Sequence, residues 1–272
     1  MQKKCRNMCI GVFDSGLGGL HILRSIVRTI PQYDYVYLGD TARAPYGHRS
    51  QETIYEYTKQ AMDFLFSAGC GMVILACNTA SSEALRALQE KFGAKQKILG
   101  VLIPAAEEAV QKSKNKRVGI IATTSTVASN KFIRELAKLD PDISVFQQEC
   151  PLLVPLIEEG EHNSRETETI LKKYLAPLLH KKIDTLILGC THYGILENKI
   201  RKIIGPDIAI ISEARVVPKK LKIYFEKHSE LEKTLRKKSI IHFYSTDGTD
   251  SFKILGSKIF GRPIEVKKAI LV

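Results

Sequence analysis

Two short apolar runs of this chain end in the same way, at a cysteine followed by small and polar residues. Residues 73–76 lead into Cys77, and residues 186–189 lead into Cys190. Runs of this length, bounded by small residues, are typical of strands buried on both faces of a sheet. Each cysteine is therefore predicted to lie where a buried strand ends and a turn or helix begins. In open α/β sheets, ligands bind at that edge.

The likeness between the two halves of the chain extends beyond the cysteines. The paired segments are residues 10–16 with 118–124, residues 35–38 with 143–146, and the loop from Asp40 with residues 148–160. Strands alternate with helices in both series, which implies mainly parallel sheets. The chain is thus predicted to be an α/β protein with two pseudosymmetric α/β domains and an active site in the cleft between them.

The domain boundaries are predicted from the point at which the pattern restarts. The first domain comprises residues 1–99 and is completed by residues 213–272, and the second comprises residues 100–212. The C-terminal segment is expected to pack on the first half, with helices between residues 216 and 238, a strand, and a helix from Thr249.

Two strands are expected near these boundaries. Residues 98–104 read as a strand that runs into a proline, and residues 208–211 read as a strand that returns the chain towards the first half. Both are short apolar segments next to glycine or proline, as strands often are.

Composition narrows the class of protein. Of the 272 residues, 44% are hydrophobic, and no apolar stretch approaches the roughly 18 residues of a membrane helix. The basic N-terminus lacks the apolar run and cleavage site of a secretion signal. We therefore expect a cytoplasmic protein with no membrane partner. The six cysteines include no CxxC pair, and thiols in the cytosol stay reduced.

The net charge of +12 is concentrated in a basic segment, residues 215–238, where nine Lys or Arg residues accompany three Glu. A solvated helix face is the ordinary interpretation of such a segment. Nucleic acid, an anionic metabolite and the steering of an acidic substrate are the alternatives.

Two cysteines at matching places in two facing halves suggest a particular chemistry. A carbon acid held between the two sulfurs, roughly 7 Å apart, could lose its proton to one and receive a proton from the other. That exchange inverts a stereocentre and requires an acid and a base that swap roles. A thiol at a helix start is expected to have a lowered pKa. His192 and Asp14 could assist Cys190 and Cys77.

Other groups in these motifs could bind the charged groups of an amino acid. Candidates for binding a carboxylate and an ammonium are Ser15, Asn78, Thr79 and Thr191, with backbone donors at Tyr46 and Gly47.

The alternatives to catalysis by the cysteines are buried structural thiols, a zinc site with His192 and Cys70, and a redox disulfide. The glycine turn at residues 16–19 is not a GxGxxG fingerprint, so dinucleotide binding is poorly supported.

Five motifs in this order resemble the glutamate racemases of the aspartate/glutamate racemase superfamily, from about residue 10 to residue 265. They are DSGLGG from Asp14, GD(x4)PYG from Gly39, ACNTAS from Ala76, VPLIE from Val154 and GCTHY from Gly189.

The resemblance implies a cofactor-independent amino-acid racemase, an isomerase that binds no metal. It would supply D-glutamate for peptidoglycan, and hence for cell-wall biogenesis and cell shape. Cys77 and Cys190 would be the acid/base pair, assisted by Asp14 and His192. Asp40 and Glu158 would be supporting acidic residues. The substrate would be bound by Asp14, Ser15, Pro45, Tyr46, Gly47, Asn78, Thr79, Thr191 and His192.

The resemblance also bears on partners and substrate choice. It implies a homodimer and allows activation by a peptidoglycan precursor, and some relatives restrain DNA gyrase. Racemisation of aspartate or another acidic amino acid is the alternative within the class, and binding of DNA or gyrase through the basic segment is the alternative outside it. The chain departs from the usual pattern at Gly194, where proline is common, and at residues 212–214, where a segment with Asp is common.

Overall fold

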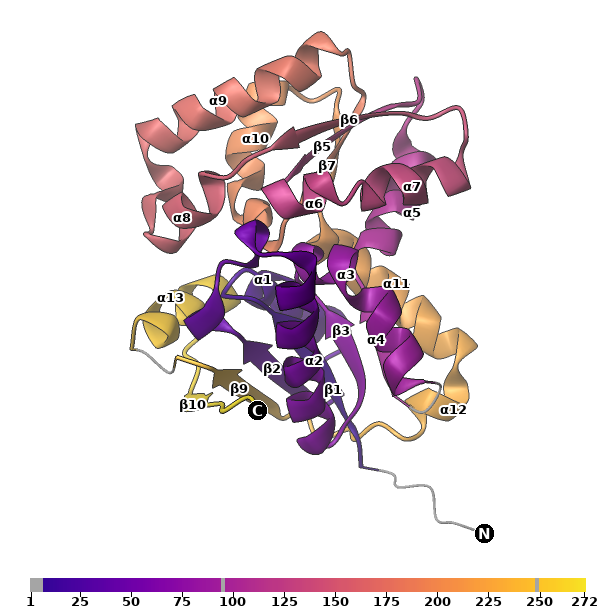
Figure 1. Ribbon diagram of the computed structural model, residues 1–272, viewed down its shortest axis with the longest axis vertical. Helices are drawn as coiled ribbons and strands as arrows, with labels where there is room; N and C mark the ends of the chain where they lie inside the picture. Colours follow the sequence, from indigo (N-terminus) through magenta and orange to yellow (C-terminus); the bar gives the residue numbers. More distant parts are fainter. Residues whose placement is uncertain (1–6, 94–95, 248–249) are drawn as a thin grey trace.

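The computed structural model describes residues 7–93, 96–247 and 250–272, and it consists of two parallel sheets covered by helices (Figure 1). Cys5 and Thr249 lie outside the described residues. The first sheet has the strand order β10-β9-β2-β1-β3-β4, and the second has the order β6-β5-β7-β8. All the strand pairs within both sheets are parallel.

The four strands of the second sheet repeat four strands of the first in the same order. The first set is β1 (Cys9–Asp14), β2 (Tyr35–Gly39), β3 (Cys70–Leu75) and β4 (Lys97–Gly100). The second set is β5 (Arg117–Ala122), β6 (Ser144–Glu149), β7 (Thr185–Gly189) and β8 (Ala209–Ile211). The predicted α/β fold with two related halves is therefore confirmed. Cys77 follows β3 and Cys190 follows β7, at equivalent carboxyl ends.

The helices connect these strands as parallel pairing requires. In the first half they are α1 (Gly19–Thr29), α2 (Gln51–Ser67), α3 (Asn78–Glu83) and α4 (Leu85–Phe92), with short 3-10 turns η1 (Thr41–Arg43) and η2 (Tyr46–His48). In the second they are α5 (Leu102–Lys112), α6 (Thr124–Ala128), α7 (Lys131–Leu139), α8 (Leu153–Glu158), α9 (Arg165–His180) and α10 (Glu197–Ile204), with η3 (Glu161–Asn163) and η4 (Thr191–Leu196).

The C-terminal segment returns to the first sheet. Helix α11 (Glu213–Lys227) packs on α1, and α12 (Ser229–Glu232) follows it. Strand β9 (Ile241–Ser245) pairs with β2, α13 (Asp250–Phe260) packs on α1, and β10 (Val266–Lys268) pairs with β9. Figure 1 shows β9 next to β2 and β10 beyond it, towards the yellow end of the colour scale. On this topology we propose domain boundaries near residues 99 and 212.

Strands β1 and β7 are buried on both faces, which explains their continuous apolar sequences. In β1, Ile10 and Val12 belong to the cluster beneath α1 and α11, whereas Cys9 and Phe13 belong to the cluster that includes buried residues of α2 and α4. In β7, Leu186 and Leu188 face one cluster and Ile187 faces the other. Two-sided burial fixes each strand in the middle of its layer, and so fixes the polar residue at its end.

Two predicted strands differ from the sequence-based expectation. Residues 98–104 are not one strand, because β4 ends at Gly100 and α5 begins at Leu102. Pro104 falls in the first turn of α5, where the missing N–H costs no helical hydrogen bond. Strand β8 does not itself return the chain, because it pairs with β7, and the return is made by α11.

Strand β10 was not predicted. In addition, no helix among residues 7–93, 96–247 and 250–272 is long and apolar enough to cross a membrane.

Candidate active site

Cys77 is the N-cap residue of α3, so its sulfur lies at a helix start as predicted. The backbone N–H of Ala80 donates to the sulfur at 3.5 Å, and the thiol donates to Ser15 Oγ at 3.4 Å. The side chain is nearly closed to solvent, with 5% exposure. Burial and then the charge of Asp14 raise the pKa of Cys77 to about 12, although the Ser15 and Ala80 contacts lower it. The predicted lowering of this pKa is therefore wrong, because desolvation outweighs the helix start.

Cys190 occupies the equivalent position before η4, where it lies next to His192. The sulfur of Cys190 is 3.9 Å from His192 Nδ1, and His192 Nε2 is 3.0 Å from Glu158 Oε1. Burial lowers the pKa of His192, but its contacts with Cys190 and Glu158 outweigh burial and raise that pKa well above its usual value. These contacts favour the imidazolium form of His192 beside the second thiol. The charge of Cys190 also raises the pKa of Cys77, which couples the two thiols electrostatically.

Asp14 connects the two halves at the end of β1. Its Oδ2 accepts a hydrogen bond from the Gly16 N–H at 3.0 Å, and its Oδ1 accepts one from Thr191 Oγ1 at 3.3 Å. Asp14 is fully buried, and burial raises its pKa while the charge of His192 opposes that shift. The carboxyl of Asp14 thus lies among groups from both cysteine motifs.

A second polar contact between the halves lies beyond Cys77. Thr79 Oγ1 is 3.0 Å from Thr123 Oγ1 and 3.4 Å from Thr126 Oγ1. The neighbouring Asn78 is buried, yet neither its amide nitrogen nor its amide oxygen has a well-formed hydrogen bond in the structure. Buried amides are nearly always paired, so Asn78 is available to an added ligand.

The loop from Asp40 to Gly47 lies against the same region. Tyr46 donates to Asp40 Oδ2 at 2.5 Å, and Asp40 also accepts from Arg43 at 2.7 Å and from Thr246 at 2.9 Å. Asp40 therefore holds the loop in shape, whereas Pro45 is solvent-exposed. Gly47 touches the second half, since a Cβ there would lie 2.9 Å from Thr123 Cβ.

Two residues of this region, Thr123 and Glu213, were missed in the sequence, and the turn glycine Gly18 was noted without its contact to the second motif. Gly18 approaches the second motif so closely that a Cβ would lie 2.3 Å from Thr191 Oγ1 and 2.7 Å from His192 Nδ1. Thr123 is the repeat counterpart of Ser15, so the duplication could have pointed to it. Glu213, at the start of α11, is 3% exposed, and burial raises its pKa to about 8. Its sequence context gave no sign of that burial.

The surroundings of the other cysteines bear on the zinc and disulfide alternatives. Cys70 lies with its sulfur 3.5 Å from that of Cys9, at the opposite end of β3 from Cys77. Within the described ranges, no group of three His, Cys, Asp or Glu residues is arranged to hold a metal ion. All five cysteines that the structure describes are free thiols.

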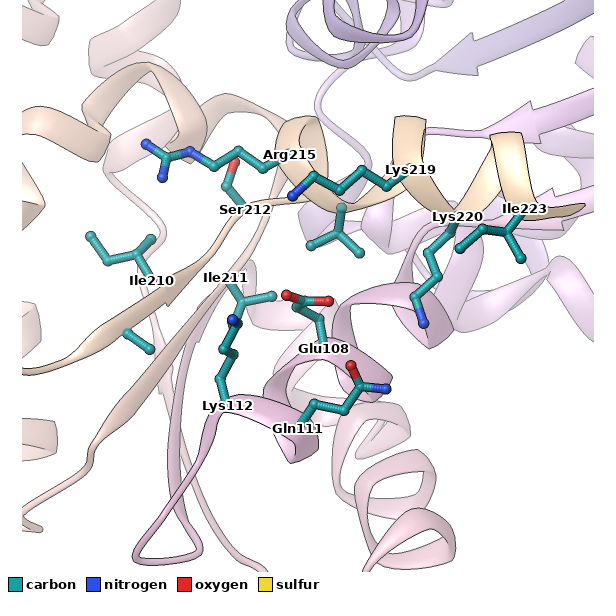
Figure 2. A pocket seen from close by; sticks show the side chains of 12 residues that line it. Glu108, Gln111, Lys112, Ile210, Ile211, Ser212, Arg215, Lys219, Lys220 and Ile223 are labelled. Atoms are coloured by element: carbon teal, nitrogen blue, oxygen red, sulfur yellow. The ribbon is translucent and has the colours of Figure 1, made fainter. Parts of the chain in front are cut away.

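Part of the basic segment lines a cavity of about 640 Å³ elsewhere in the molecule. Figure 2 shows Arg215, Lys219 and Lys220 on one helix and Glu108 and Lys112 on another. Lys220 pairs with Glu107 at 2.7 Å, and Arg215 pairs with Glu197. The basic segment is therefore not only a solvent-exposed helix face, because it lines a cavity and forms ion pairs. None of the predicted site residues lines this cavity.

Comparison with known proteins places this geometry in context. Residues 10–217 match the family model described as Asp/Glu/Hydantoin racemase. The chain is 43% identical over 261 residues to the glutamate racemase of Persephonella marina, covering 96% of each chain. Among solved structures it is similar to glutamate racemase RacE1 of Bacillus anthracis, with a TM-score of 0.91, 33% identity and 98% of each chain covered.

A further solved structure is similar to almost the same degree. It is the glutamate racemase of Francisella tularensis in complex with D-glutamate, with a TM-score of 0.89 and 33% identity. The match covers 97% of this chain and 98% of that chain.

Proposed function

Because this chain belongs to the Asp/Glu/Hydantoin racemase family, we infer that it racemises glutamate by acid–base chemistry at two cysteines. The observation that carries the inference is that Cys77 and Cys190 follow equivalent strands of two related sheets, while the motifs around them meet at Asp14 and Thr191. A thiol from each half can serve one of the two opposite faces of a carbon atom held between the motifs.

In the proposed reaction, the thiolate of one cysteine takes the proton from the α-carbon, and the thiol of the other gives a proton to the opposite face. The electron pair of the broken C–H bond stays on carbon between the two steps and forms the new C–H bond. Cys77 takes the proton from D-glutamate and Cys190 takes it from L-glutamate. Because the enantiomers have equal free energy, each thiol must serve as acid in one direction and as base in the other.

The neighbouring ionisable groups return each thiol to the protonation state that the next turnover requires. His192 is held as an imidazolium next to Cys190, so it can return a proton to that sulfur. Glu158 supports His192 through its hydrogen bond. Asp14, whose raised pKa favours proton uptake, serves Cys77, with the Ser15 hydroxyl bonded to the thiol. Because the site is buried and its local dielectric constant is low, these electrostatic interactions are stronger than they would be in water.

The substrate is held by hydrogen-bonding side chains from both halves. We assign its carboxylate and ammonium groups to Ser15, Asn78, Thr79, Thr191 and His192, with Asp14 facing the ammonium. Tyr46 and Gly47, after Pro45, supply backbone N–H groups from a loop that Asp40 supports. The unpaired amide of Asn78 favours this assignment, since its NH₂ group can donate to a substrate carboxylate.

The product D-glutamate is used in peptidoglycan synthesis, which places the chain in cell-wall biogenesis and the maintenance of cell shape. We further propose that it works in the cytoplasm. Catalysis by two thiols needs both in the reduced state, and the cytosol maintains that state.

The test is racemisation of pure L-glutamate by the purified chain without pyridoxal phosphate. Optical rotation should decay to zero, and in heavy water the α-hydrogen should be replaced by deuterium. Cys77→Ala and Cys190→Ala should each lower kcat by about 10³-fold or more, as expected for loss of an essential acid or base. Cys70→Ala is the matched control, because Cys70 is a buried thiol at the other end of the same strand; it should retain racemisation.

Aspartate assayed beside glutamate tests the substrate. A higher kcat/KM for aspartate would overturn the assignment to glutamate while leaving the two-thiol mechanism in place. Full activity in either Cys77→Ala or Cys190→Ala would instead overturn the mechanism.

We also propose a homodimer, as the resemblance implies, and activation by a peptidoglycan precursor, which the resemblance allows. Sedimentation of the purified chain tests the first, and titration of the racemase assay with the precursor tests the second. DNA binding is not favoured, because Arg215 and Lys220 of the basic segment are paired with acidic residues. A salt-dependent gel shift that is lost on neutralising Lys219, Lys220 and Lys222 would support it.

A further inference from the structure

Cys9 and Cys70 are a pair of buried thiols that the proposed reaction does not use. Their sulfur atoms are 3.5 Å apart and share an S–H hydrogen bond. The two residues are partners in the pairing of β1 with β3, at the amino ends of both strands. Asp14 ends β1 and Cys77 follows β3, so the pair lies at the end of the sheet away from the candidate active site.

A β-bulge brings the two cysteines together. Ile10 pairs with Met72. One position earlier, a regular ladder would place Gly71 opposite Cys9. The register shifts at that point, and Cys70 takes the place of Gly71 as the partner of Cys9. Bulges re-aim side chains in this way, and both cysteines belong to the same hydrophobic cluster.

Gly11 provides the room that the pair occupies. It lies two residues after Cys9 and so on the same face of β1. A Cβ on Gly11 would lie 3.2 Å from the sulfur of Cys70 and 3.4 Å from its Cβ. Neighbouring strands are about 4.8 Å apart, and the Cα atoms of a disulfide are separated by about 4.4–6.8 Å. A disulfide here therefore requires the sulfurs to approach by only about 1.5 Å.

The two thiols are not equivalent. The thiol of Cys9 donates to the carbonyl oxygen of Ala68 at 3.9 Å, so the proton between the sulfurs is that of Cys70. This hydrogen bond from Cys70 lowers the pKa of Cys9; burial opposes the shift, and the positive charge of Arg236 adds to it. The same hydrogen bond, together with burial, raises the pKa of Cys70. Cys9 is therefore the thiol that ionises more readily and attacks as the nucleophile.

The pair lies directly beneath an exposed turn. Residues 67–69, between α2 and β3, are exposed. The carbonyl of Ala68 accepts from the Cys9 thiol, and the carbonyl of Gly69 accepts from the Cys9 backbone N–H at 3.1 Å. Local opening of such a turn costs far less free energy than unfolding of the chain, so a small oxidant can reach the sulfurs.

We propose that Cys9 and Cys70 form a redox modification site, at which a hydroperoxide such as hydrogen peroxide converts the two thiols into a reversible disulfide. The Cys9 thiolate attacks a peroxide oxygen, so an S–O bond forms and the O–O bond breaks. The hydroxide that leaves takes up the proton released by Cys9. The Cys70 sulfur then attacks the Cys9 sulfur, so the S–S bond forms and the S–O bond breaks. The second hydroxide leaves with the Cys70 proton, and the peroxide is reduced to water.

Mass spectrometry of the full chain, digested without reduction, tests the proposal. After treatment with hydrogen peroxide and blocking of the remaining thiols, tryptic peptides 7–24 and 60–86 should be linked, and dithiothreitol should separate them. Cys77 shares the second peptide, so the Cys77→Ala variant should give the same link. Cys150 is the matched control, because it is a buried thiol that contacts the Gln148 carbonyl. It should be oxidised at least about tenfold more slowly.

Trapping with dimedone tests the order of the two steps. In Cys70→Ser, the oxidation stops at the sulfenic acid of Cys9, which dimedone should label. In Cys9→Ser, labelling of Cys70 should be at least about tenfold weaker. Equal labelling would overturn the assignment of Cys9 as the attacking thiol. A pair that stays reduced, or a link from Cys9 to Cys5 or to another cysteine, would overturn the modification site itself.

The cross-link should also stabilise the fold, because it joins residues 61 positions apart and restricts the unfolded chain. The Tm of the oxidised parent should exceed that of the reduced parent by about 4 °C or more, and dithiothreitol should reverse the rise. Cys70→Ser should show no rise. An unchanged Tm in the linked protein would overturn this stabilisation. None of these measurements requires racemisation, so their failure would leave the proposed function standing.

Discussion

Thr191 donates a hydrogen bond across the two halves to Asp14, with 3.3 Å between its Oγ1 and the carboxyl oxygen Oδ1. Asp14 ends the central strand of the first sheet, and Thr191 follows the cysteine at the end of the second sheet's β7. The bond joins residues that are 177 positions apart in the chain. It therefore ties the placement of one cysteine motif to that of the other.

Removing this bond should impair catalysis. Thr191→Val keeps the shape of the side chain but removes the donor, so kcat/KM for glutamate should fall about tenfold or more. Thr191→Ser keeps the hydroxyl and should stay within about threefold of the parent. Steady-state kinetics measure both variants, and a fully active Thr191→Val would show that the contact does not contribute.

Asp14→Asn should make Cys77 more reactive while it lowers racemisation. The Asp14 charge helps to raise the pKa of Cys77, so its removal lowers that pKa and increases the thiolate fraction at a given pH. Iodoacetamide alkylation at pH 9, followed by mass spectrometry of the Cys77 peptide, should be faster in the variant.

Ser15→Ala provides the opposite control. The Ser15 contact lowers the pKa of Cys77, so its loss should slow alkylation of the same peptide. Equal rates in both variants and the parent would mean that neither neighbour governs the thiol.

Glu158→Gln should move the alkaline limb of the kcat profile to lower pH. Activity that depends on the His192 imidazolium falls as pH rises through the pKa of His192 in the folded state. Glu158 is one of the two groups that raise this pKa, so its neutralisation lowers the pKa and brings the loss of activity to lower pH. The pH dependence of kcat is the measurement. Glu159→Gln, next along the chain and exposed, should leave the profile in place.

Gly18→Ala should damage the site without unfolding the protein. The added methyl group would lie 2.3 Å from Thr191 Oγ1, so the second motif has to shift. A misplacement of roughly 1 Å in a catalytic site can lower kcat/KM by about 100-fold.

Gly93→Ala is the comparison, because Gly93 has a φ of +66° and no atom within 4 Å of an added Cβ. It should cost roughly 1 kcal/mol in the free energy of unfolding and leave the kinetic constants unchanged. Urea unfolding and steady-state kinetics separate the two effects.

The positions of the strands could be predicted from the sequence because burial on both faces leaves long apolar runs, as in β3 and β7. The positions of Cys77 and Cys190 followed directly from those runs. Strand β10 was not readable, because its three residues lie at the edge of the sheet and two of them are exposed lysines. The start of α5 was misread because Pro104 suggested a break where the first helical turn tolerates proline.

Within the site, residue identity was easier to predict than electrostatic environment. The motifs pointed to Asp14, Asn78, Thr191 and His192, and the structure brings them close to the cysteines or to each other. The direction of the Cys77 pKa shift depends on desolvation, which a linear sequence does not express. Glu213 was missed for the same reason, since an acidic residue in a first helical turn is usually a solvated partner of the helix dipole.

The chain passes between the sheets twice, and the helices that follow these passages, α5 and α11, pack against each other. Two adjacent connections favour a hinge rotation of the halves about the contact between α5 and α11. Glutamate could then be admitted by one swing that separates Thr191 from Asp14 and Thr79 from Thr123 together. A molecule wedged between α5 and α11 would oppose that swing and slow product release without touching either sulfur atom.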